Sequence, residues 1–427
     1  MNIAIAGYGV EGRSNYQYFS RLGHQITILD ESPEVHNLPA GVATRLGEHA
    51  FEDLADFDMI VRGGGILPRK LKNARKIWSA TNEFFAKCPA PVIGVTGTKG
   101  KGTTCSLIAS ILKQSGKTTH LVGNIGVPPL DVLPGIQSND IVVYELSSFQ
   151  LYDVERSPHI AVLLMIEPDH LDIHASFDEY LRAKQNITHF QTEHDVLIYA
   201  KENAYSSTIA QASRAAKIAV PDVKTAHVSN GFFWYADQKI CSTDVLKLPG
   251  QFNQDNACAA ITAAWRYTQD KSAVEAGLAD FTGLPHRLKY VRTVEGVDYY
   301  DDSIATTVGS AVAAIGAFAQ PKIVILGGSS KGIVDFTEVA KVAAQSNVKK
   351  ALIIGDQAPK LIEALKSYNV AYEDLGTQIT MAQIVKKSHD LAHPGDVVLL
   401  SPACASFGMF KGYADRGDQF VRAVENL

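Results

Sequence analysis

The chain lacks a long hydrophobic run and any excess of basic residues. No apolar stretch approaches the ~18 residues of a membrane-spanning helix, so we expect no membrane partner. Its 40 Lys and Arg residues stand against 45 Asp and Glu residues. This balance gives no electrostatic footprint for a nucleic-acid partner. With 46% hydrophobic and 20% charged residues, the composition is that of an ordinary folded globular protein.

Cysteine is scarce as well. The five cysteines are far apart and odd in number, and they form neither a zinc-binding pattern nor a disulfide framework. The opening MNIAIAGYG runs straight into an apolar strand pattern, without the basic region and cleavage site of a signal peptide. Both absences favour a reducing, cytoplasmic location.

Short runs rich in Ile and Val alternate with amphipathic stretches along the whole chain. Continuous apolar runs of this length are typical of parallel strands covered on both faces, and their alternation with helical segments predicts an α/β fold. The strands we predict are Asn2–Ala6, Gln25–Leu29, Asp58–Val61, Pro91–Val95, Ile141–Tyr144, Ile160–Met165, Asp195–Ala200, Lys322–Leu326, Lys350–Ile354 and Asp396–Leu400.

Two breaks in this pattern suggest domain boundaries. Two prolines precede a new strand in Lys87–Pro91, and a second break lies in Thr282–Pro285. A length of 427 residues suits two to three domains of ~150 residues each. We therefore predict three α/β domains, at residues 1–89, 90–283 and 284–427.

The first glycine-rich loop, Gly7–Gly12, has the pattern GYGVEG and follows the first predicted strand, with Asp30 at the end of the next. Such a loop brings backbone N–H groups and a helix N-terminus close to a diphosphate. Three interpretations remain open: a nicotinamide-dependent dehydrogenase, a domain that holds a nucleotide without redox chemistry, and a tight turn that binds nothing.

The second glycine-rich loop, Gly94–Thr104, reads GVTGTKGKGTT between a predicted strand and helix. Backbone N–H groups in such a loop cradle phosphate oxygens while a lysine, here Lys101, neutralises charge. Gly102 occupies the place where a Ser or Thr normally ligates Mg²⁺, so Thr103 or Thr104 must supply the hydroxyl. We predict a nucleoside triphosphate site here.

This loop is similar to the TGTNGK(S/T)T loop of the Mur ligase and folylpolyglutamate synthetase superfamily. Further blocks resemble the glutamate-adding Mur ligases and span nearly the whole chain. They are Gly123–Gly126, Glu145–Leu151 (ELSSFQL), Pro168–Asp172 (PDHLD), Leu181–Lys184, Gly283–Arg287 (GLPHR), Asp302–Thr306 (DSIAT) and Ser401–Ser406 (SPACAS).

The resemblance implies a three-domain fold: a Rossmann-like N-terminal domain for a UDP-linked substrate, a central P-loop domain for ATP and a C-terminal Rossmann-like domain for an amino acid. The implied enzyme is an ATP-dependent ligase that adds glutamate to UDP-N-acetylmuramoyl-L-alanine through an acyl phosphate. It would act in the cytoplasm as a monomer in peptidoglycan synthesis, and so in cell-wall biogenesis, cell shape and division.

The resemblance also assigns roles to individual residues. Lys101, His170 and Lys184 would be catalytic, and two Mg²⁺ ions would be held by Thr103, Glu145, His170 and a carbamoylated Lys184. The implied ATP contacts are Gly97, Thr98, Lys99, Gly100, Lys101, Gly102, Thr103, Asn253, Asn256, Arg287 and Asp302. Gly9, Glu11, Asp30, Gly65 and Asn124 would bind the UDP substrate, and Thr306, Lys331, Ser406 and Tyr413 would bind glutamate.

The chain departs from the family pattern at several of these places. Glu11 stands where relatives have a small hydroxyl side chain, and Gly63–Ile66 reads GGGI instead of SPGI. Met165 replaces an Asn, Ile304 replaces the Lys of the DSKAT block, and Tyr413 replaces a Phe.

Two alternatives stay open beside the glutamate ligase. One is another ligase of the superfamily, either a folylpolyglutamate synthetase, which Gly102 favours, or a Mur relative that adds a different amino acid. The other is a nucleotide-binding regulatory protein without catalysis. The sequence does not decide between D- and L-glutamate.

Overall fold

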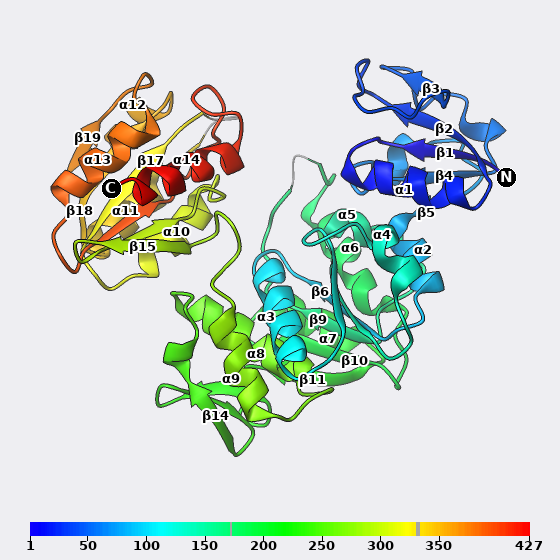
Figure 1. The fold of residues 1–427 in the computed structure, drawn as a ribbon, viewed down its shortest axis with the longest axis horizontal. Coiled ribbons are helices and arrows are strands. Elements are labelled where there is room, and N and C mark those ends of the chain that lie inside the picture. Colours follow the sequence, from blue (N-terminus) through cyan, green and yellow to red (C-terminus); the bar gives the residue numbers. More distant parts are fainter. Residues whose placement is uncertain (171–172, 330–333) are drawn as a thin grey trace. The chain divides into compact units, whose positions relative to one another are not determined.

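The computed structural model describes residues 1–170, 173–329 and 334–427 (Figure 1). The chain forms two compact units. The first consists of Met1–Val245 with Asp255–Asp280, and the second of Leu246–Gln254 with Phe281–Leu427.

The first unit begins with a five-stranded parallel sheet of order β3-β2-β1-β4-β5. Its strands are β1 (Asn2–Ala6), β2 (Gln25–Asp30), β3 (Ala43–Leu46), β4 (Met59–Arg62) and β5 (Ile77–Ser79), and its helices are α1 (Val10–Arg21) and α2 (Ala80–Lys87). The chain leaves β1 toward β2 and later returns to β4 on the other side of β1. In such sheets, ligands bind at the carboxyl ends of the strands where the order reverses.

A second parallel sheet in this unit has the order β11-β10-β9-β6-β8-β7. Its strands are β6 (Val92–Thr96), β7 (Thr119–Gly123), β8 (Ile141–Glu145), β9 (Ile160–Leu163), β10 (Val196–Ala200) and β11 (Ala216–Val220). The helices between them are α3 (Lys101–Gln114), α4 (Pro129–Val132), α5 (Ser148–Leu151), α6 (Phe177–His189) and α7 (Ala204–Ala212). The central position of β6, between β8 and β9, gathers the loops after these three strands at one edge.

A small antiparallel sheet follows, made of β12 (Ala226–Ser229), β13 (Phe232–Tyr235) and β14 (Gln238–Ser242). Two helices come next, α8 (Gln251–Ala264) and α9 (Lys271–Asp280). Helix α9 packs against α3. Helix α3 begins within the second glycine-rich loop, Gly94–Thr104, called the phosphate loop below.

The second unit contains a six-stranded sheet of order β15-β16-β20-β17-β18-β19, parallel except for the pair β15 and β16. Its strands are β15 (Lys289–Val294), β16 (Val297–Asp301), β17 (Lys322–Gly327), β18 (Val348–Ile354), β19 (Tyr372–Asp374) and β20 (Val397–Leu400). Its helices are α10 (Val308–Gly316), α11 (Thr337–Gln345), α12 (Ala358–Ser367), α13 (Met381–Leu391) and α14 (Tyr413–Glu425).

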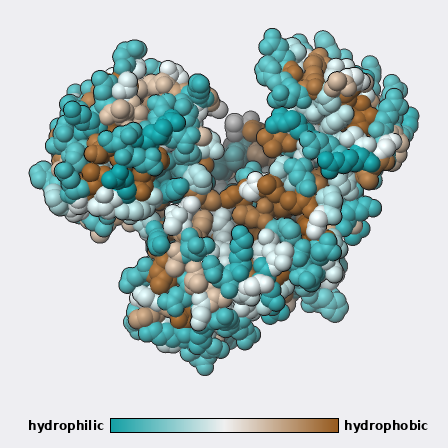
Figure 2. Space-filling model, viewed as in Figure 1, coloured by the Kyte–Doolittle hydropathy of each residue, from teal (hydrophilic) through white to brown (hydrophobic). Residues whose placement is uncertain are grey.

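Alternation along the strands of this sheet builds a core on each face. Val324 and Leu326 pack in one cluster with residues of α10, α11 and α12. Ile323 and Ile325 pack in the other with residues of α13 and α14. Because both faces are covered, both sets of side chains are apolar. Outside the core the face drawn in Figure 2 is largely hydrophilic over these helices, with single apolar residues between.

In the first unit, one face of the N-terminal sheet shares a continuous core with the second sheet. Ile3 and Val61 belong to the same cluster as Val142 and Leu163, while Ala4 and Ile60 face a smaller separate cluster. This shared core explains why the two parallel sheets form one compact unit.

The predicted α/β fold class is confirmed. Every predicted strand is present, and the observed ends differ from the predicted ones by at most two residues. The domain boundaries near residues 89 and 283 stay a prediction. No helix in the described part of the chain is long and apolar enough to cross a membrane.

Candidate active site

The phosphate loop joins the end of β6 to the start of α3, at the edge where β8 and β9 also end. Gly100 caps the helix with φ +84°, and a Cβ atom there would lie 2.2 Å from Oδ1 of Asn256. The backbone N–H of Thr98 donates to the Met165 carbonyl after β9 at 2.8 Å. The loop is therefore fixed on two sides, and its N–H groups and the α3 N-terminus make an anion-binding end.

Two lysines reach the same carbonyl of this loop from different helices. Nζ of Lys101 donates to the carbonyl oxygens of Gly97 and Thr98, at 3.1 and 3.0 Å. Nζ of Lys184, on α6, donates to Gly97 O at 2.7 Å and lies 4.6 Å from the Tyr180 ring centroid. Burial, and then the charge of Lys101, lower the pKa of Lys184 well below its usual range. Lys184 is thus biased toward the neutral amine, the form that can react with CO₂.

Glu145 ends β8 and is buried beside the loop. Its carboxylate accepts a hydrogen bond from Nδ2 of Asn124 at 3.0 Å, and its backbone oxygen accepts one from Asn124 N–H at 3.1 Å. Electrostatic coupling also joins Glu145 to Lys184. The fold therefore brings a residue assigned to the UDP substrate, Asn124, next to one assigned to Mg²⁺.

His170 follows β9 in a left-handed backbone conformation, with φ +53°. Its ring lies 5.2 Å from the Phe149 ring and 6.3 Å from that of Tyr180, so it stands near the other groups of this edge. Among the described residues, no three His, Cys, Asp or Glu side chains are grouped to hold a metal ion. A metal at this edge would need further ligands.

The hydroxyls that could ligate Mg²⁺ behave differently. The Thr104 hydroxyl donates to Oδ1 of Asn256 at 3.5 Å, which ties α3 to α8. Thr103, one residue earlier, is buried, and its role as the hydroxyl ligand stays a prediction. Lys99 points elsewhere and pairs with Glu167 at 2.5 Å. Asn253, earlier on α8, donates from Nδ2 to the Pro249 carbonyl at 2.7 Å.

The N-terminal loop Gly7–Gly12 joins β1 to α1. Oδ2 of Asp30, at the end of β2, accepts the N–H of Tyr8 at 2.7 Å, and Oδ1 accepts the N–H of Ser32 at 2.9 Å. Glu11 lies in the first turn of α1, and its Oε2 accepts the N–H of Gly64 at 2.7 Å. Gly9 and Gly65 are exposed at the same sheet edge.

The second unit carries a buried polar network after β16 and β20. Asp302 accepts hydrogen bonds from the Ser401 hydroxyl at 2.8 Å and the Leu288 N–H at 3.1 Å. Burial raises the pKa of Asp302 to about 7, although the charge of exposed Arg287 lowers it. The neighbouring Asp301 accepts from Nδ1 of His286 at 2.7 Å, which raises the pKa of His286.

Two of the residues assigned to glutamate, Thr306 and Ser406, lie in the loops after the same strands. Ser406 is buried, and its carbonyl accepts the N–H of Phe410 at 3.1 Å. Thr306 is exposed, and so is the Tyr413 side chain at the start of α14. Lys331 lies outside the described residues. The roles of all these residues stay predictions.

Comparison with known proteins identifies the family. Residues 95–264 match the Mur ligase middle domain and residues 286–404 match the Mur ligase glutamate ligase domain. The UDP-N-acetylmuramoylalanine–D-glutamate ligase of Symbiobacterium thermophilum is 37% identical over 99% of this chain and 98% of its own length. The enzyme of the same name from Clostridium tetani is 33% identical over 100% and 96%.

The chain belongs to the Mur ligase family. It is thus an ATP-dependent ligase that forms amide bonds. In fold it is similar to the UDP-N-acetylmuramate-alanine ligase MurC of Thermotoga maritima, with a TM-score of 0.64 at 17% identity over 100% of this chain and 99% of that one. The predicted three-domain α/β fold is that of the Mur ligases.

Three buried residues of this Mur ligase escaped the sequence reasoning. Arg62, Arg416 and His174 each organise a loop that carries predicted site residues. The Arg62 guanidinium is fully buried and pairs with Asp153, and it also donates to the Phe149 carbonyl at 2.8 Å. It links the end of β4 to the ELSSFQL block. A buried charge of this kind leaves no periodic signal in the sequence.

Arg416 plays the same part in the second unit. It is fully buried and donates to the hydroxyl and carbonyl of Ser303, at 2.9 and 2.8 Å, and twice to the Cys404 carbonyl at 3.2 Å. The Ser303 hydroxyl in turn donates to the Tyr413 carbonyl at 2.8 Å. One guanidinium thus joins the loops that carry Thr306, Ser406 and Tyr413.

His174 ties the segment that follows His170 to the ELSSFQL block, Glu145–Leu151. Its Nε2 lies 3.0 Å from the Ser148 hydroxyl, and its ring stacks on that of Phe149 at 5.2 Å. Burial lowers the pKa of His174. A neutral, buried ring suits a structural role that fixes the segment around His170.

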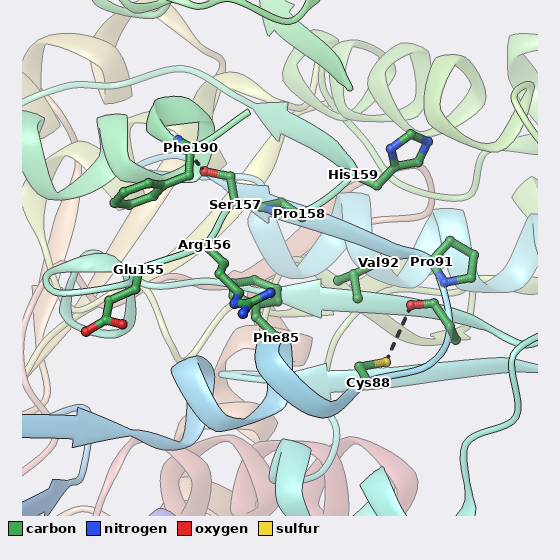
Figure 3. Close-up of a pocket in the computed structure, with 11 residues that line it drawn as sticks. Phe85, Cys88, Pro91, Val92, Glu155, Arg156, Ser157, Pro158, His159 and Phe190 are labelled. Carbon is green, nitrogen blue, oxygen red and sulfur yellow. Dashed lines mark hydrogen bonds between the residues drawn. The ribbon is translucent and has the colours of Figure 1, made fainter. Parts of the chain in front are cut away.

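A pocket of about 490 Å³ lies away from this chemistry (Figure 3). It is lined at the amino ends of β6 and β9, where Pro91 and Pro158 precede the strands, and Phe85, Arg156 and Phe190 line it too. The phosphate loop follows the carboxyl end of β6, so this pocket is at the opposite sheet edge. None of the predicted site residues lines it.

Proposed function

We propose that this Mur ligase joins D-glutamate to UDP-N-acetylmuramoyl-L-alanine in peptidoglycan precursor synthesis. Two relatives with that name are 37% and 33% identical over nearly the whole chain. The D configuration comes from these names, because both forms of glutamate present the same chemical groups.

The observation that carries the proposal is the cluster of charged groups at one edge of the second sheet. Lys101 and Lys184 share the Gly97 carbonyl, and Lys184 is electrostatically coupled to Glu145. A regulatory domain that only binds nucleotide needs no second buried lysine beside its phosphate loop. A phosphoryl-transfer enzyme needs fixed positive charge and oxygen ligands at the same place.

The chemistry follows from the weakness of a carboxylate as an electrophile. The γ-phosphoryl group of ATP passes to the alanine carboxylate of the UDP substrate and gives an acyl phosphate and ADP. The amine of glutamate attacks the acyl carbon, and the amide forms as phosphate leaves. Lys101 neutralises charge on the transferring group, and the loop N–H groups fix the ATP phosphates.

Mg²⁺ would neutralise phosphate charge in this site. The donors fit a hard cation, because the Glu145 carboxylate and the Thr103 hydroxyl are oxygen ligands, and Mg²⁺ commonly completes its shell with substrate phosphates and water. Lys184 would join only as a carbamate, since a protonated amine has no lone pair and repels a cation, whereas a carbamate carries anionic oxygen atoms of the kind that Mg²⁺ prefers. His170 would be a ligand of a second Mg²⁺ ion.

The remaining assignments concern the two ends of the reaction. Glu11, Asp30 and Gly65 would surround the uridine diphosphate, and Asn124 would face the sugar end. Thr306, Lys331, Ser406 and Tyr413 would hold glutamate, while Asn253, Asn256, Arg287 and Asp302 would contact ATP. A monomer in the cytoplasm is the setting that we propose.

Phosphate release measured with purified protein, ATP and Mg²⁺ tests the function. Phosphate release should require both UDP-N-acetylmuramoyl-L-alanine and D-glutamate, and L-glutamate in place of D-glutamate should give little phosphate release. Lysine, diaminopimelate and alanine serve as controls for other Mur ligases, and a dihydrofolate acceptor for the folate enzymes. Release with one of these instead would refute the substrate assignment, and no release with any pair would favour the regulatory protein.

Lys331 gives a second test of the amino acid. A charge-assisted hydrogen bond contributes about 1.5–3 kcal/mol, so Lys331→Ala should raise the glutamate KM by roughly tenfold or more and leave the ATP KM little changed. Loss of ATP affinity with an unchanged glutamate KM would show that Lys331 is misassigned.

A further inference from the structure

Glu11 and Gly64 meet across the place where the first sheet reverses its strand order. The Gly7–Gly12 loop follows β1, and Gly63–Gly65 follows the adjacent β4. The N–H of Gly64 donates to Oε2 of Glu11 at 2.7 Å. A Cβ atom at Gly64 would lie 3.1 Å from that oxygen and 3.4 Å from Cγ of Gln150. Position 64 therefore needs an N–H group and tolerates little side chain.

The two residues depart from the family pattern together. The family pattern that the chain resembles has a small hydroxyl residue at position 11 and proline at position 64. A proline has no N–H to donate, so the contact between Glu11 and Gly64 requires both replacements. Glu11 thus has a defined hydrogen-bond partner in the N–H group of Gly64, which only a residue other than proline can supply.

The Glu11 carboxylate has no ion-pair partner among the described residues. Among the described residues, no basic nitrogen lies within ion-pair distance of its carboxylate, and its Oε1 accepts no hydrogen bond. The charge of Arg62 acts on Glu11, but Arg62 is already paired with Asp153 and also donates to the Ile66 carbonyl at 3.2 Å.

The other titratable groups around Glu11 do not neutralise it either. The Tyr144 hydroxyl of β8 is bound to the Thr81 hydroxyl at 3.1 Å and is coupled to Glu11. Asp30, the other acid at this edge, already accepts two backbone N–H groups. Burial raises the pKa of Glu11 despite the opposing effects of the Gly64 N–H and Arg62.

A diphosphate at the N-terminus of α1 would bring more negative charge to the same turn. We infer that Glu11 is a ligand-binding residue of the UDP site, and that it takes up a proton when the diphosphate binds and donates that O–H to a phosphate oxygen. Oε2 stays with Gly64, and Oε1 carries the proton drawn from solvent. The carboxylic acid then supplies a hydroxyl donor at the position where the resembled family pattern has a small hydroxyl residue. This inference rests on the proposed function.

The sign of the pH effect follows from linkage. Where Glu11 is already protonated in the free protein, binding needs no proton and affinity is independent of pH. Above the pKa of free Glu11, binding must draw a proton, so the Kd for UDP should rise with pH by up to tenfold per unit. The dependence ends above the pKa of Glu11 in the complex.

Calorimetry with UDP and with UDP-N-acetylmuramoyl-L-alanine, in two buffers of different ionisation enthalpy at pH 8, measures this uptake. The unmodified protein should take up about one proton at most, set by the pKa difference between free and bound states. Glu11→Gln and Glu11→Ser should bind without Glu11-linked uptake and with a flatter pH profile. Glu34→Gln, an exposed acid in the same unit, is the matched control and should behave as the unmodified protein does.

A double-mutant cycle tests the pairing. Gly64→Ala should weaken UDP binding more when Glu11 is present than when it is Ser, because the added Cβ crowds the Glu11 carboxylate. Equal uptake in Glu11→Gln and the unmodified protein, or additive effects in the cycle, would overturn the inference. Failure of UDP and the UDP-sugar to bind at any pH would instead refute the proposed function.

Discussion

Two glycine-rich loops follow central strands of two parallel sheets, and the side chains beside them differ in kind, with amines at one loop and carboxylates at the other. The loop after β6 is served by Lys101 and Lys184. The loop after β1 is served by Asp30 and Glu11. Both offer backbone N–H groups and a helix N-terminus, so the backbone geometry alone would suit an anion at either place.

The difference fits the work that we propose for each loop. A phosphoryl group in transfer develops charge that must be stabilised by fixed cations. A diphosphate that is only a handle does not react, so neutral donors suffice to hold it. The side chains around the loop, and not the glycine pattern, separate a reacting phosphate from one that is merely held.

Removal of the Lys101 cation, which neutralises the transferring phosphoryl group, should cause the largest loss of activity. Lys101→Ala should lower kcat by at least about a hundredfold, the usual cost of losing one stabilising donor to a transition state, with UDP affinity unchanged. Phosphate release measures the rate. The control variant Lys113→Ala, at an exposed position of the same helix, should have a kcat close to that of the unmodified protein. Equal rates for the two variants would show that Lys101 does not stabilise the transferring phosphoryl group, and that the two loops do not differ in this way.

The second lysine tests whether carbamoylation turns a cation into a ligand. Lys184→Ala should lower activity by roughly tenfold or more, because even groups that only support metal ligands cost about 10- to 100-fold when they are removed, and acetate should restore part of it. A carbamate signal after labelling with isotopic bicarbonate should appear only when Lys184 is present. Arg182→Ala, exposed on α6, is the control. Unchanged activity in Lys184→Ala would refute the idea.

The glycines of the N-terminal loop test its backbone geometry apart from its charge. A Cβ atom at Gly12 would lie 2.0 Å from the Gly7 carbonyl oxygen, whereas one at Gly9 would meet nothing within 4 Å. Gly12→Ala should therefore cost about 1–3 kcal/mol of unfolding free energy, as overpacking does, and Gly9→Ala much less. Thermal unfolding measures both. Equal loss in the two variants would mean that the close approach in the loop is not what Gly12 protects.

The smallest effect is expected in the second unit. Ile304 stands where relatives have lysine, and its side chain is partly buried beside the Asp302 network. Ile304→Lys should change kcat/KM by less than about tenfold, or 1.4 kcal/mol, because the enzyme already works without this charge. A change in kcat/KM alone, with stability unaltered, would show that position 304 faces the reaction. No change would show that the side chain points away.

Much of the fold could be predicted, because the central strands of covered parallel sheets are continuous apolar runs. The strands that the sequence did not reveal are of another kind. β15, at the edge of its sheet, mixes exposed and partly buried residues and has one buried position, and β12 to β14 form a small antiparallel sheet with few fully buried positions. Their polar residues break the apolar pattern, so periodicity is a weak guide to them.

The candidate site was predicted as a set of motifs, but the contacts between them were not. The blocks around Lys101, Glu145 and Lys184 could be named from the sequence because each stands beside a strand end or on a helix. The fold decides that Lys101 and Lys184 share one carbonyl, and that burial lowers the pKa of Lys184 well below its usual range. Residue order along the chain carries no information about the desolvation of a side chain.

The sequence by itself determined the α/β class, the central strands, both glycine-rich loops and the family. Only the tertiary structure revealed the buried guanidinium groups of Arg62 and Arg416, and only it placed Glu11 against Gly64. The reason is physical. Hydrophobic periodicity is a local property of the chain, whereas the partner and the protonation of a buried charge depend on residues that are distant in sequence and meet only when the sheets assemble.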